Sequence, residues 1–312
     1  MFSNKSNIKL GLILTVLIVI VTIMFVTDGK NERTFKENLV DIDTSKISEI
    51  SIYSKAQGEV KLLKTNNLWK VKLTGDKSSA VPESKMISLF NQLLEIKPKR
   101  LAARNENKWK DFKVDSSGTR VIVKEGGNTS LDLIIGRFAF QQPRTMNTYV
   151  RLFNDVDVYE VDGFLQATFN QDANSFRDGR ILGYKTKNEN WKNLEFTYPA
   201  DSSFQLVKLE NRWRTVKYSF IDSAKTAQYL NQLSNLSSSE FIDDINPENL
   251  ISPDNILKIT NENNVVITIS AYKKNDKIII TSSANPESLF NGNENELMNK
   301  IFIGESSLIL QK

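Results

Sequence analysis

An internal repeat constrains the fold of this chain more than any other feature. Residues 50–69 match residues 194–213 without a gap, and Trp69 and Trp213 hold the same place in the two copies, 144 positions apart. Further along, FNQLLEI from Phe90 matches LNQLSNL from Leu230 at an offset of 140. Because order, spacing and periodicity agree, the sequence predicts two copies of one supersecondary unit.

The two copies predict the same order of elements. Alternating apolar and polar residues in ISEISIYS (47–54) and NLEFTYP (193–199) are typical of half-buried strands. A second strand, a polar turn and a third strand with the tryptophan follow in each copy. More strands are expected after the helix of each copy, at 119–125, 131–136, 148–153, 156–161, 256–260, 265–272 and 277–283.

A helix is predicted after the third strand of each copy. In the first copy it begins near Pro82 and Glu83 and ends at Lys97-Pro98; in the second, Asp222 is the expected N-cap. The predicted apolar faces consist of Met86, Ile87, Phe90, Leu93 and Leu94 in the first copy, and Ala227, Leu230, Leu233 and Leu236 in the second. We therefore expect an α+β fold, with a helix on one face of an antiparallel sheet in each copy and both tryptophans packed between sheet and helix.

The N-terminus carries a long apolar segment, Leu10–Val26, interrupted only by Gly11, Thr15 and Thr22. Its length approaches the roughly 20 residues that a helix needs to cross a bilayer. A cleaved signal peptide is the alternative, but no small-x-small cleavage pattern follows the segment. The sequence thus predicts an uncleaved transmembrane helix as the contact with the lipid bilayer.

The orientation of this segment follows from the basic residues before it. Lys5 and Lys9 precede the apolar run, and a short basic tail ahead of a first hydrophobic segment usually stays in the cytoplasm. We expect a single-pass protein of the inner membrane with its large domain outside the cytoplasm. The predicted organisation is a cytoplasmic tail and anchor over residues 1–30, a first α+β unit over 31–185 and a second over 186–312.

Composition excludes several kinds of chemistry. The chain has neither cysteine nor histidine, which removes thiolate nucleophiles, His-based catalytic triads and the commonest transition-metal ligands. Its 41 Lys plus Arg against 37 Asp plus Glu give a net charge of +4, too small to indicate nucleic-acid binding. Glycine-rich nucleotide-binding motifs are also missing from the sequence. We therefore predict no catalytic residues, no cofactor-binding residues and no metal ligands.

Several stretches together resemble the bacterial domain of unknown function 4340. They are NNLWKV (66–71), LDLIIG (131–136) followed by TYVRL (148–152), SFRDGRIL (175–182) and SSANPESLF (282–290), within a similarity that covers most of residues 33–303. The resemblance implies an initial membrane segment followed by a repeated β-rich unit. It also implies subunits of an ABC-type transport system, of the kind implicated in gliding motility, as partners, and it implies no catalytic residues.

The stretch SFRDGRIL is the one candidate for a small binding site. Arg177 and Arg180 flank Asp178 and Gly179 and could contact an anion. The alternative is a turn between the two copies in which Phe176 and Ile181 anchor the chain and Asp178 pairs with an arginine, because local ion pairs of this kind are common.

Two further segments carry clustered charge. Residues 154–162 hold four acidic side chains, but the spacing of a calcium-binding loop is missing and a solvated strand end is expected instead. Residues 98–110 combine basic residues with Trp109 and are expected to form a solvated connection after the helix, whose cations could touch lipid headgroups.

The sequence leaves three hypotheses for function. The first is a non-catalytic, membrane-anchored scaffold or accessory subunit of an envelope assembly. The second is a domain that binds an envelope glycan in a pocket between the copies, lined by aromatic residues such as Trp109, Tyr149, Tyr159 or Tyr198. The third is a hydrolase that uses two carboxylates facing each other across a cleft.

Overall fold

A computed structural model describes residues 13–22, 36–141, 145–183, 188–210, 212–216, 221–274 and 276–309. The chain divides into two compact units, Met1–Leu39 and Val40–Lys312. In the first unit, residues 13–22 are helical and Thr22 Oγ1 donates a hydrogen bond to the carbonyl of Ile18, 2.6 Å away. None of the helices in the described ranges is long and apolar enough to cross a membrane. The ends of the predicted segment Leu10–Val26 lie outside those ranges.

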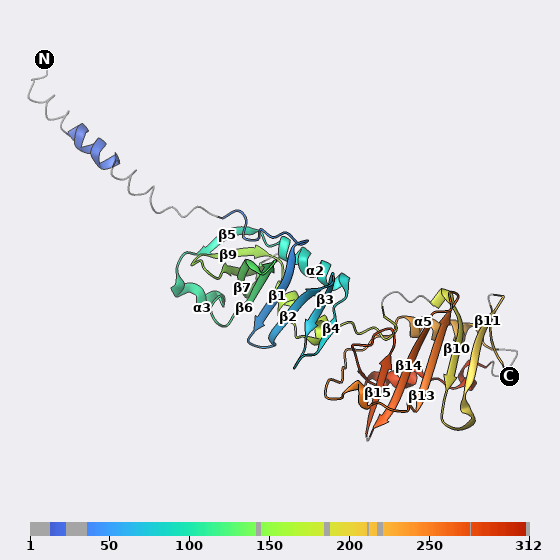
Figure 1. Ribbon diagram of the computed structural model, residues 1–312. Coiled ribbons are helices and arrows are strands. Elements are labelled where there is room, and N and C mark those ends of the chain that lie inside the picture. Colours follow the sequence, from blue (N-terminus) through green and yellow to red (C-terminus); the bar gives the residue numbers. More distant parts are fainter. Residues whose placement is uncertain are drawn as a thin grey trace, which may run out of the picture. The chain divides into compact units, whose positions relative to one another are not determined.

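The second unit contains two antiparallel sheets and several helices, which confirms the α+β class (Figure 1). The nine-stranded sheet has the order β4 (Ser78–Ala80), β3 (Leu68–Lys72), β2 (Gly58–Thr65), β1 (Ile47–Ser54), β6 (Thr119–Glu125), β7 (Asn128–Gln141), β8 (Thr145–Leu152), β9 (Val158–Asp162) and β5 (Pro98–Ala103). The seven-stranded sheet has the order β12 (Arg212–Thr215), β11 (Phe204–Leu209), β10 (Trp191–Thr197), β13 (Asn255–Asn261), β14 (Val266–Lys274), β15 (Lys277–Ser282) and β16 (Phe290–Asn291).

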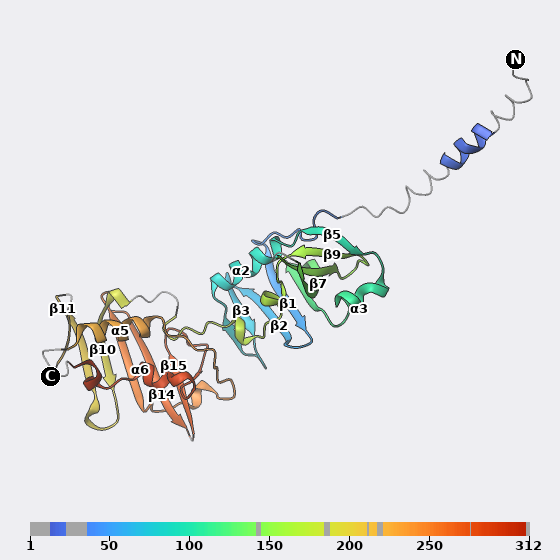
Figure 2. The same cartoon turned by 180° about the vertical axis from the view of Figure 1, so that it is seen from behind.

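Helices connect and cover these strands (Figure 2). The α-helices after residue 40 are α2 (Glu83–Leu94), α3 (Trp109–Phe112), α4 (Gln166–Phe169), α5 (Ser223–Ser234) and α6 (Leu297–Ile301). Short 3-10 helices are η1 (Glu106–Lys108), η2 (Asn174–Phe176), η3 (Asn188–Asn190), η4 (Ala200–Ser202), η5 (Pro247–Asn249), η6 (Glu294–Glu296) and η7 (Glu305–Leu308).

The two sheets share one pattern of strand pairing. Ile50 pairs with Leu62 between β1 and β2, and Leu194 pairs with Leu206 between β10 and β11, which is the same register at an offset of 144. The strand register is also interrupted at the same place in both sheets. The interruption lies between Ile47 and Glu49 in β1, and between the corresponding Trp191 and Asn193 in β10. Helices α2 and α5 each contain 12 residues and begin 140 positions apart. Three strands, a helix and further strands thus follow one another in both sheets as predicted. The expectation of a solvated connection over residues 98–110 was wrong, because Pro98–Ala103 form β5, which pairs with β9, and Trp109 packs against a buried cluster.

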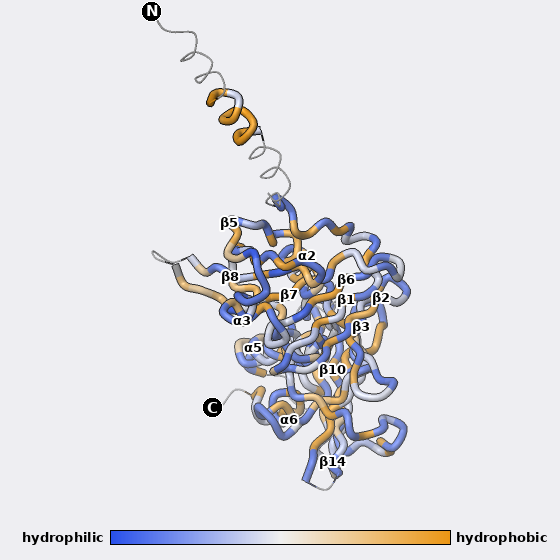
Figure 3. The backbone as a smooth tube through the Cα atoms, turned by 90° about the vertical axis from the view of Figure 1, so that its left-hand side faces the viewer, coloured by the Kyte–Doolittle hydropathy of each residue, from blue (hydrophilic) through white to orange (hydrophobic). Residues whose placement is uncertain are grey.

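Alternation along the strands creates the core of each sheet. Ile50, Ile52 and Leu62 in the first sheet and Leu194 and Leu206 in the second are at most 1% exposed. Apolar and polar residues alternate along the inner strands of both sheets, and the loops are mainly polar (Figure 3). Burying these aliphatic side chains supplies the main driving force for each sheet–helix unit.

The helices cover these cores with faces that differ in part from the predicted ones. In α2 the buried residues are Met86, Leu89 and Leu93, whereas Ile87 and Leu94 are 51% and 44% exposed. The prediction that Ile87 and Leu94 lie on the buried face was wrong. The two residues are seven positions apart and share one face of the helix, and that face points away from the sheet.

Helix α5 shows the same kind of difference. Thr226 and Tyr229 are buried there and Ala227 is exposed, although Leu230 and Leu233 lie in the core as predicted. The predicted N-cap is confirmed, since Asp222 Oδ1 accepts hydrogen bonds from the backbone N–H groups of residues 224 and 225, at 2.9 and 3.0 Å.

The repeated tryptophans pack as structural residues. The ring of Trp69 meets Phe90 of α2 edge-on, with ring centroids 5.8 Å apart. Trp213 is partly buried against the core of the second sheet. This confirms that both indoles pack against their sheet–helix cores. Trp191, which the sequence did not single out, is the tryptophan with 1% exposure, and it begins β10.

We expect Leu62→Ala and Leu206→Ala to destabilise the protein by about 2–5 kcal/mol each, because both remove a fully buried side chain and leave a cavity. Urea unfolding followed by circular dichroism measures the change. Leu68→Ala and Leu209→Ala are the matched controls, since these side chains are 66% and 50% exposed, and their effect should stay within about 0.5 kcal/mol. Equal losses in all four variants would contradict the proposed cores.

A cross-strand charge cluster makes part of the stability depend on pH. Burial raises the pKa of the Glu49 carboxyl, but hydrogen bonds from Lys124 and Lys61 outweigh burial, so that its pKa lies below the ordinary value of 4.5. A carboxyl whose pKa is lowered on folding stabilises the fold above its unfolded pKa, and this contribution is lost as the pH falls through the folded pKa.

Glu49→Gln should therefore lower the urea midpoint at about pH 7, and it should differ less from the unchanged protein at an acidic pH well below the ordinary carboxyl pKa of 4.5, as the pH falls through the lowered pKa of Glu49. Chemical unfolding at the two pH values measures this difference. A gap of the same size at both would show that the charge of Glu49 does not contribute.

Candidate functional site

The stretch SFRDGRIL connects the two sheets through its backbone. The N–H of Asp178 donates to the carbonyl of Ala80 at the end of β4, at 3.0 Å, and the N–H of Ile181 donates to Leu236 after α5, also at 3.0 Å. Phe176 and Ile181 are 6% and 0% exposed and anchor the two ends of the stretch. The segment is thus a junction that is hydrogen-bonded to both copies.

Gly179 is required at the centre of this junction. Its carbonyl accepts a hydrogen bond from the N–H of Ser238 at 2.8 Å. A Cβ atom added to Gly179 would lie 2.4 Å from the carbonyl oxygen of Ser238, too close for any other residue. The glycine therefore allows the two backbones to approach closely.

Arg177 is the buried cation of the junction. Its side chain is fully buried, and Nη1 donates to both carboxylate oxygens of Asp243, at 3.0 and 2.8 Å, and to Asn174 Oδ1 at 3.2 Å. The guanidinium carbon lies 3.7 Å from the centre of the Phe241 ring. Its Nε and Nη2 have no hydrogen-bond partner within the described residues. Burying a charge in this way is costly unless a partner compensates it, and Asp243 provides that compensation.

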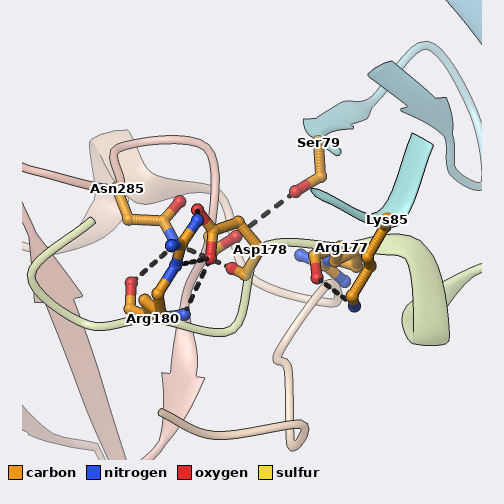
Figure 4. Close-up of polar contacts among 7 residues, drawn as sticks. Ser79, Lys85, Arg177, Asp178, Arg180 and Asn285 are labelled. Carbon is orange, nitrogen blue, oxygen red and sulfur yellow. Dashed lines mark hydrogen bonds and ion pairs between the residues drawn. The ribbon is translucent and has the colours of Figure 1, made fainter. Parts of the chain in front are cut away.

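Arg180 has its own carboxylate. Nε and Nη2 of Arg180 each lie 2.8 Å from one oxygen of Asp178, in a bidentate pair (Figure 4). Asn285 holds the same turn from the second sheet, because its Nδ2 donates to the carbonyls of Asp178 and Arg180 at 2.8 and 3.1 Å. This is the local pairing that was the alternative to an anion contact.

Lys85 of α2 completes the polar contacts of the junction. Its Nζ donates to the carbonyls of Ser175 and Arg177, at 2.5 and 3.0 Å, and Figure 4 shows it beside Arg177. Burial lowers the pKa of the Lys85 ammonium, although the nearby charge of Asp178 opposes this shift. The lysine therefore ties the helix of the first copy to the connecting segment.

A hollow of about 860 Å³ opens at this junction, and both arginines of the predicted anion contact, Arg177 and Arg180, line it. Lys85 and Lys300 also line it, and Asp178 is its acidic residue. Both arginines are occupied by carboxylates, so the geometry explains them as structural residues, and an anion contact remains a prediction. Asp243, Asn285 and Lys85 were missed because they lie far from residues 175–182 along the chain and no local pattern marks them.

The acidic residues of 154–162 separate into different pairs. Glu160 is 3% exposed, accepts a hydrogen bond from Asn147 Nδ2 at 2.5 Å and pairs with Arg100. Asp162 is exposed and lies 2.8 Å from Lys99. The expectation of a solvated strand end was wrong for Asp157 and Glu160, which are 4% and 3% exposed; the pairing of β9 with β8 and β5 buries Glu160. The described residues contain no cluster of three or more His, Cys, Asp or Glu side chains able to hold a metal ion.

The aromatic residues named for a glycan pocket do not share one pocket. Tyr149 and Tyr159 are 7% and 0% exposed inside the first sheet's packing. Tyr198 belongs to the second core, where its hydroxyl donates to the carbonyl of Ile303 at 2.6 Å and burial raises its pKa. Trp109 alone lines an open groove, on the first sheet.

Comparison with known proteins identifies the family. The family model described as Domain of unknown function (DUF4340) matches residues 69–255, more than half of the chain. The chain belongs to this family. The match runs from β3 to the start of β13 and includes the junction. No curated protein and no solved structure matches the chain.

Two adjacent aspartates form ion pairs that differ in burial. Asp243 pairs with the buried Arg177, and Asp244 pairs with the exposed Lys277. Asp243→Asn should destabilise the protein by about 2 kcal/mol, because it leaves the Arg177 charge uncompensated. The loss should be smaller than the roughly 3–5 kcal/mol typical of a fully buried pair, because the Asp243 side chain is 41% exposed. Asp244→Asn is the matched control, since Asp244 and Lys277 are both well exposed, and it should leave the urea midpoint unchanged. Equal effects of the two variants would show that Arg177 does not depend on its carboxylate.

Proposed function

We propose that this protein is a membrane-anchored, extracytoplasmic scaffold or accessory subunit of an envelope assembly, without catalytic activity of its own. The proposed architecture is a transmembrane helix followed by two repeats of a sheet–helix unit, over residues 31–185 and 186–312. An ABC-type transport system is the proposed partner, because the family resemblance points to proteins of that kind.

An exposed aromatic patch on the first sheet carries the proposal of a partner. The patch consists of Phe138, Phe140, Met146 and Phe164, which are 39%, 70%, 39% and 38% exposed. Phe138 lies 6.2 Å from Phe140 and 4.8 Å from Phe164 between ring centroids. Clusters of exposed aromatic residues are typical of protein interaction sites, where such side chains provide most of the binding energy.

The strand pairing explains why the patch is exposed. The last residue of β7 that pairs with β6 is Ile135, so Phe138 and Phe140 pair with β8 alone. Phe140 lies opposite Met146, one residue beyond the last pair of β8 with β9, and this places both side chains on one face of the two-stranded tip. Within the described residues the tip has no third strand beside it, and binding to a partner would cover its exposed side chains.

The N-terminal segment supports attachment to a membrane. Leu10–Val26 is apolar over nearly the length of a bilayer span, and Lys5 and Lys9 precede it. The proposed anchor would hold the larger unit outside the cytoplasm, with the lipid bilayer as its first partner.

The polar groups of the junction support a structural role. Arg177, Arg180 and Lys85 are engaged by Asp243, Asp178 and backbone carbonyls, so their charges link the two copies. A catalytic site would instead need a nucleophile, acid or base directed at a bound substrate.

Affinity purification from gently solubilised membranes tests the proposal. The unchanged protein should sediment with the membrane fraction and recover transporter subunits, identified by mass spectrometry. A variant that lacks residues 1–30 should appear in the soluble fraction. Recovery of the protein alone would contradict the accessory role.

Phe140→Ser should reduce recovery of the partner at least about tenfold, because truncating a central interface aromatic typically costs 2 kcal/mol or more. Leu68→Ser is the matched control, as Leu68 is 66% exposed on another part of the same sheet. Quantitative mass spectrometry of the purified material compares the two. Equal recovery with both variants would show that the partner binds elsewhere.

A further inference from the structure

A groove crosses the face of the nine-stranded sheet opposite α2. Trp69 contacts α2, and the pairing of Leu62 with Val71 and with Ile50 places the aliphatic core on that same face. Tyr53 and Arg120 alternate with core residues and point to the other face, where the groove has a volume of about 950 Å³. This volume falls within the range of small-molecule binding sites.

One cross-strand row forms much of the groove. Tyr53 of β1 pairs with Arg120 of β6, Arg120 with Ile134 of β7, and Ile134 with Arg151 of β8. All four residues line the groove, together with Trp109 and Phe153. An aliphatic floor is thus bordered by three aromatic rings and two guanidinium groups.

The second sheet provides an internal control for this row. Its residues in the same register are Thr197, Ile256, Ser270 and Thr281. The core-side row keeps its apolar character, since Ile52 and Val121 correspond to Phe196 and Leu257. The fold therefore requires the core row but neither the arginines nor the tyrosine of the groove row.

Arg151 is a buried cation with carbonyl partners. Its Nε donates to Val114, and its Nη1 donates to the carbonyls of residues 152, 153 and 155, at distances of 2.8 to 3.1 Å. The guanidinium carbon lies 3.7 Å from the centre of the Trp109 ring, whose Nε1 donates to Val156 at 3.0 Å. The bonds of Arg151 use Nε and Nη1. Burial lowers the pKa of the Arg151 guanidinium, and the charges of Glu106, Asp155, Asp132 and Asp115 oppose this shift only in part. An anion in the groove would add to that compensation.

Arg120 presents a second cation from the other side of Ile134. Its Nε and Nη2 donate to Asp132 at 2.8 and 2.7 Å, which fixes the guanidinium and leaves Nη1 for a ligand. The guanidinium carbon lies 3.5 Å from the centre of the Phe153 ring. Arg120 and Arg151 are two strands apart, about 10 Å along the sheet.

We propose that this groove binds an acidic oligosaccharide. A pyranose ring has an apolar C–H face, which suits the aromatic surfaces, and polar hydroxyls at its rim, which suit Ser116 at the edge of the groove. Acidic groups on rings that have one ring between them match two cations whose strands lie about 10 Å apart. Tyr53 and Phe153 are both 40% exposed, so the groove is open enough for a chain to pass through. This site is separate from the aromatic patch proposed for partner binding.

Titration calorimetry on the full-length protein in detergent tests the site with trigalacturonate, the neutral trisaccharide maltotriose and adenosine monophosphate. Trigalacturonate should bind, and the other two should bind at least about tenfold more weakly, because only the acidic trisaccharide offers both ring faces and repeated carboxylates. Absence of binding, or equal or tighter binding of either comparison ligand, would overturn the proposal.

Arg120→Gln should weaken trigalacturonate binding at least about tenfold, through the loss of one charge-assisted contact. Lys258→Gln is the matched control, since Lys258 lies on the corresponding face of the second sheet and is exposed. Thermal unfolding verifies that both variants are folded. If Arg120→Gln is unfolded, Phe153→Leu replaces it, with the same expected loss of affinity. Unchanged affinity of the folded groove variant for trigalacturonate would overturn the proposed binding site. This measurement is independent of the recovery of a membrane partner.

Discussion

One-sided burial of an antiparallel sheet is the constraint on which the rest of this structure depends. The strands that begin each copy, β1 and β2 or β10 and β11, alternate apolar and polar residues, and a helix of 12 residues covers their apolar face in both copies. In the first sheet a smaller cluster around Ile134 and Tyr149 also covers part of the opposite face. The same register and the same irregularity recur in both sheets, because the same alternation has to be satisfied twice. The repeated tryptophans follow from this requirement, at the margin where sheet and helix meet.

The junction shows how two such units are joined without a large shared core. Backbone hydrogen bonds from Asp178 and Ile181 attach the connecting stretch to both copies, and Gly179 permits the close approach. The cost of burying Arg177 is offset by Asp243 and by the ring of Phe241. Charged residues that could suggest a binding site thus have a structural explanation.

The differences between the two copies carry more functional information than their similarities. Residues equivalent in register agree where they form the core and differ on the opposite face, where only the first sheet has Tyr53, Arg120 and Arg151. The exposed extension of β7 and β8 also belongs to the first sheet.

The sequence by itself determined the α+β class, the order of three strands and a helix that begins each copy, the N-cap at Asp222 and the family. These are local or periodic properties, which neighbouring residues encode. Only the tertiary structure decided which face of α2 is buried, since Ile87 and Leu94 are apolar yet exposed. It also decided the pairing of Arg177 with Asp243 and the row that joins Arg120 to Arg151, because contacts between distant segments depend on strand register and packing, which no local pattern records.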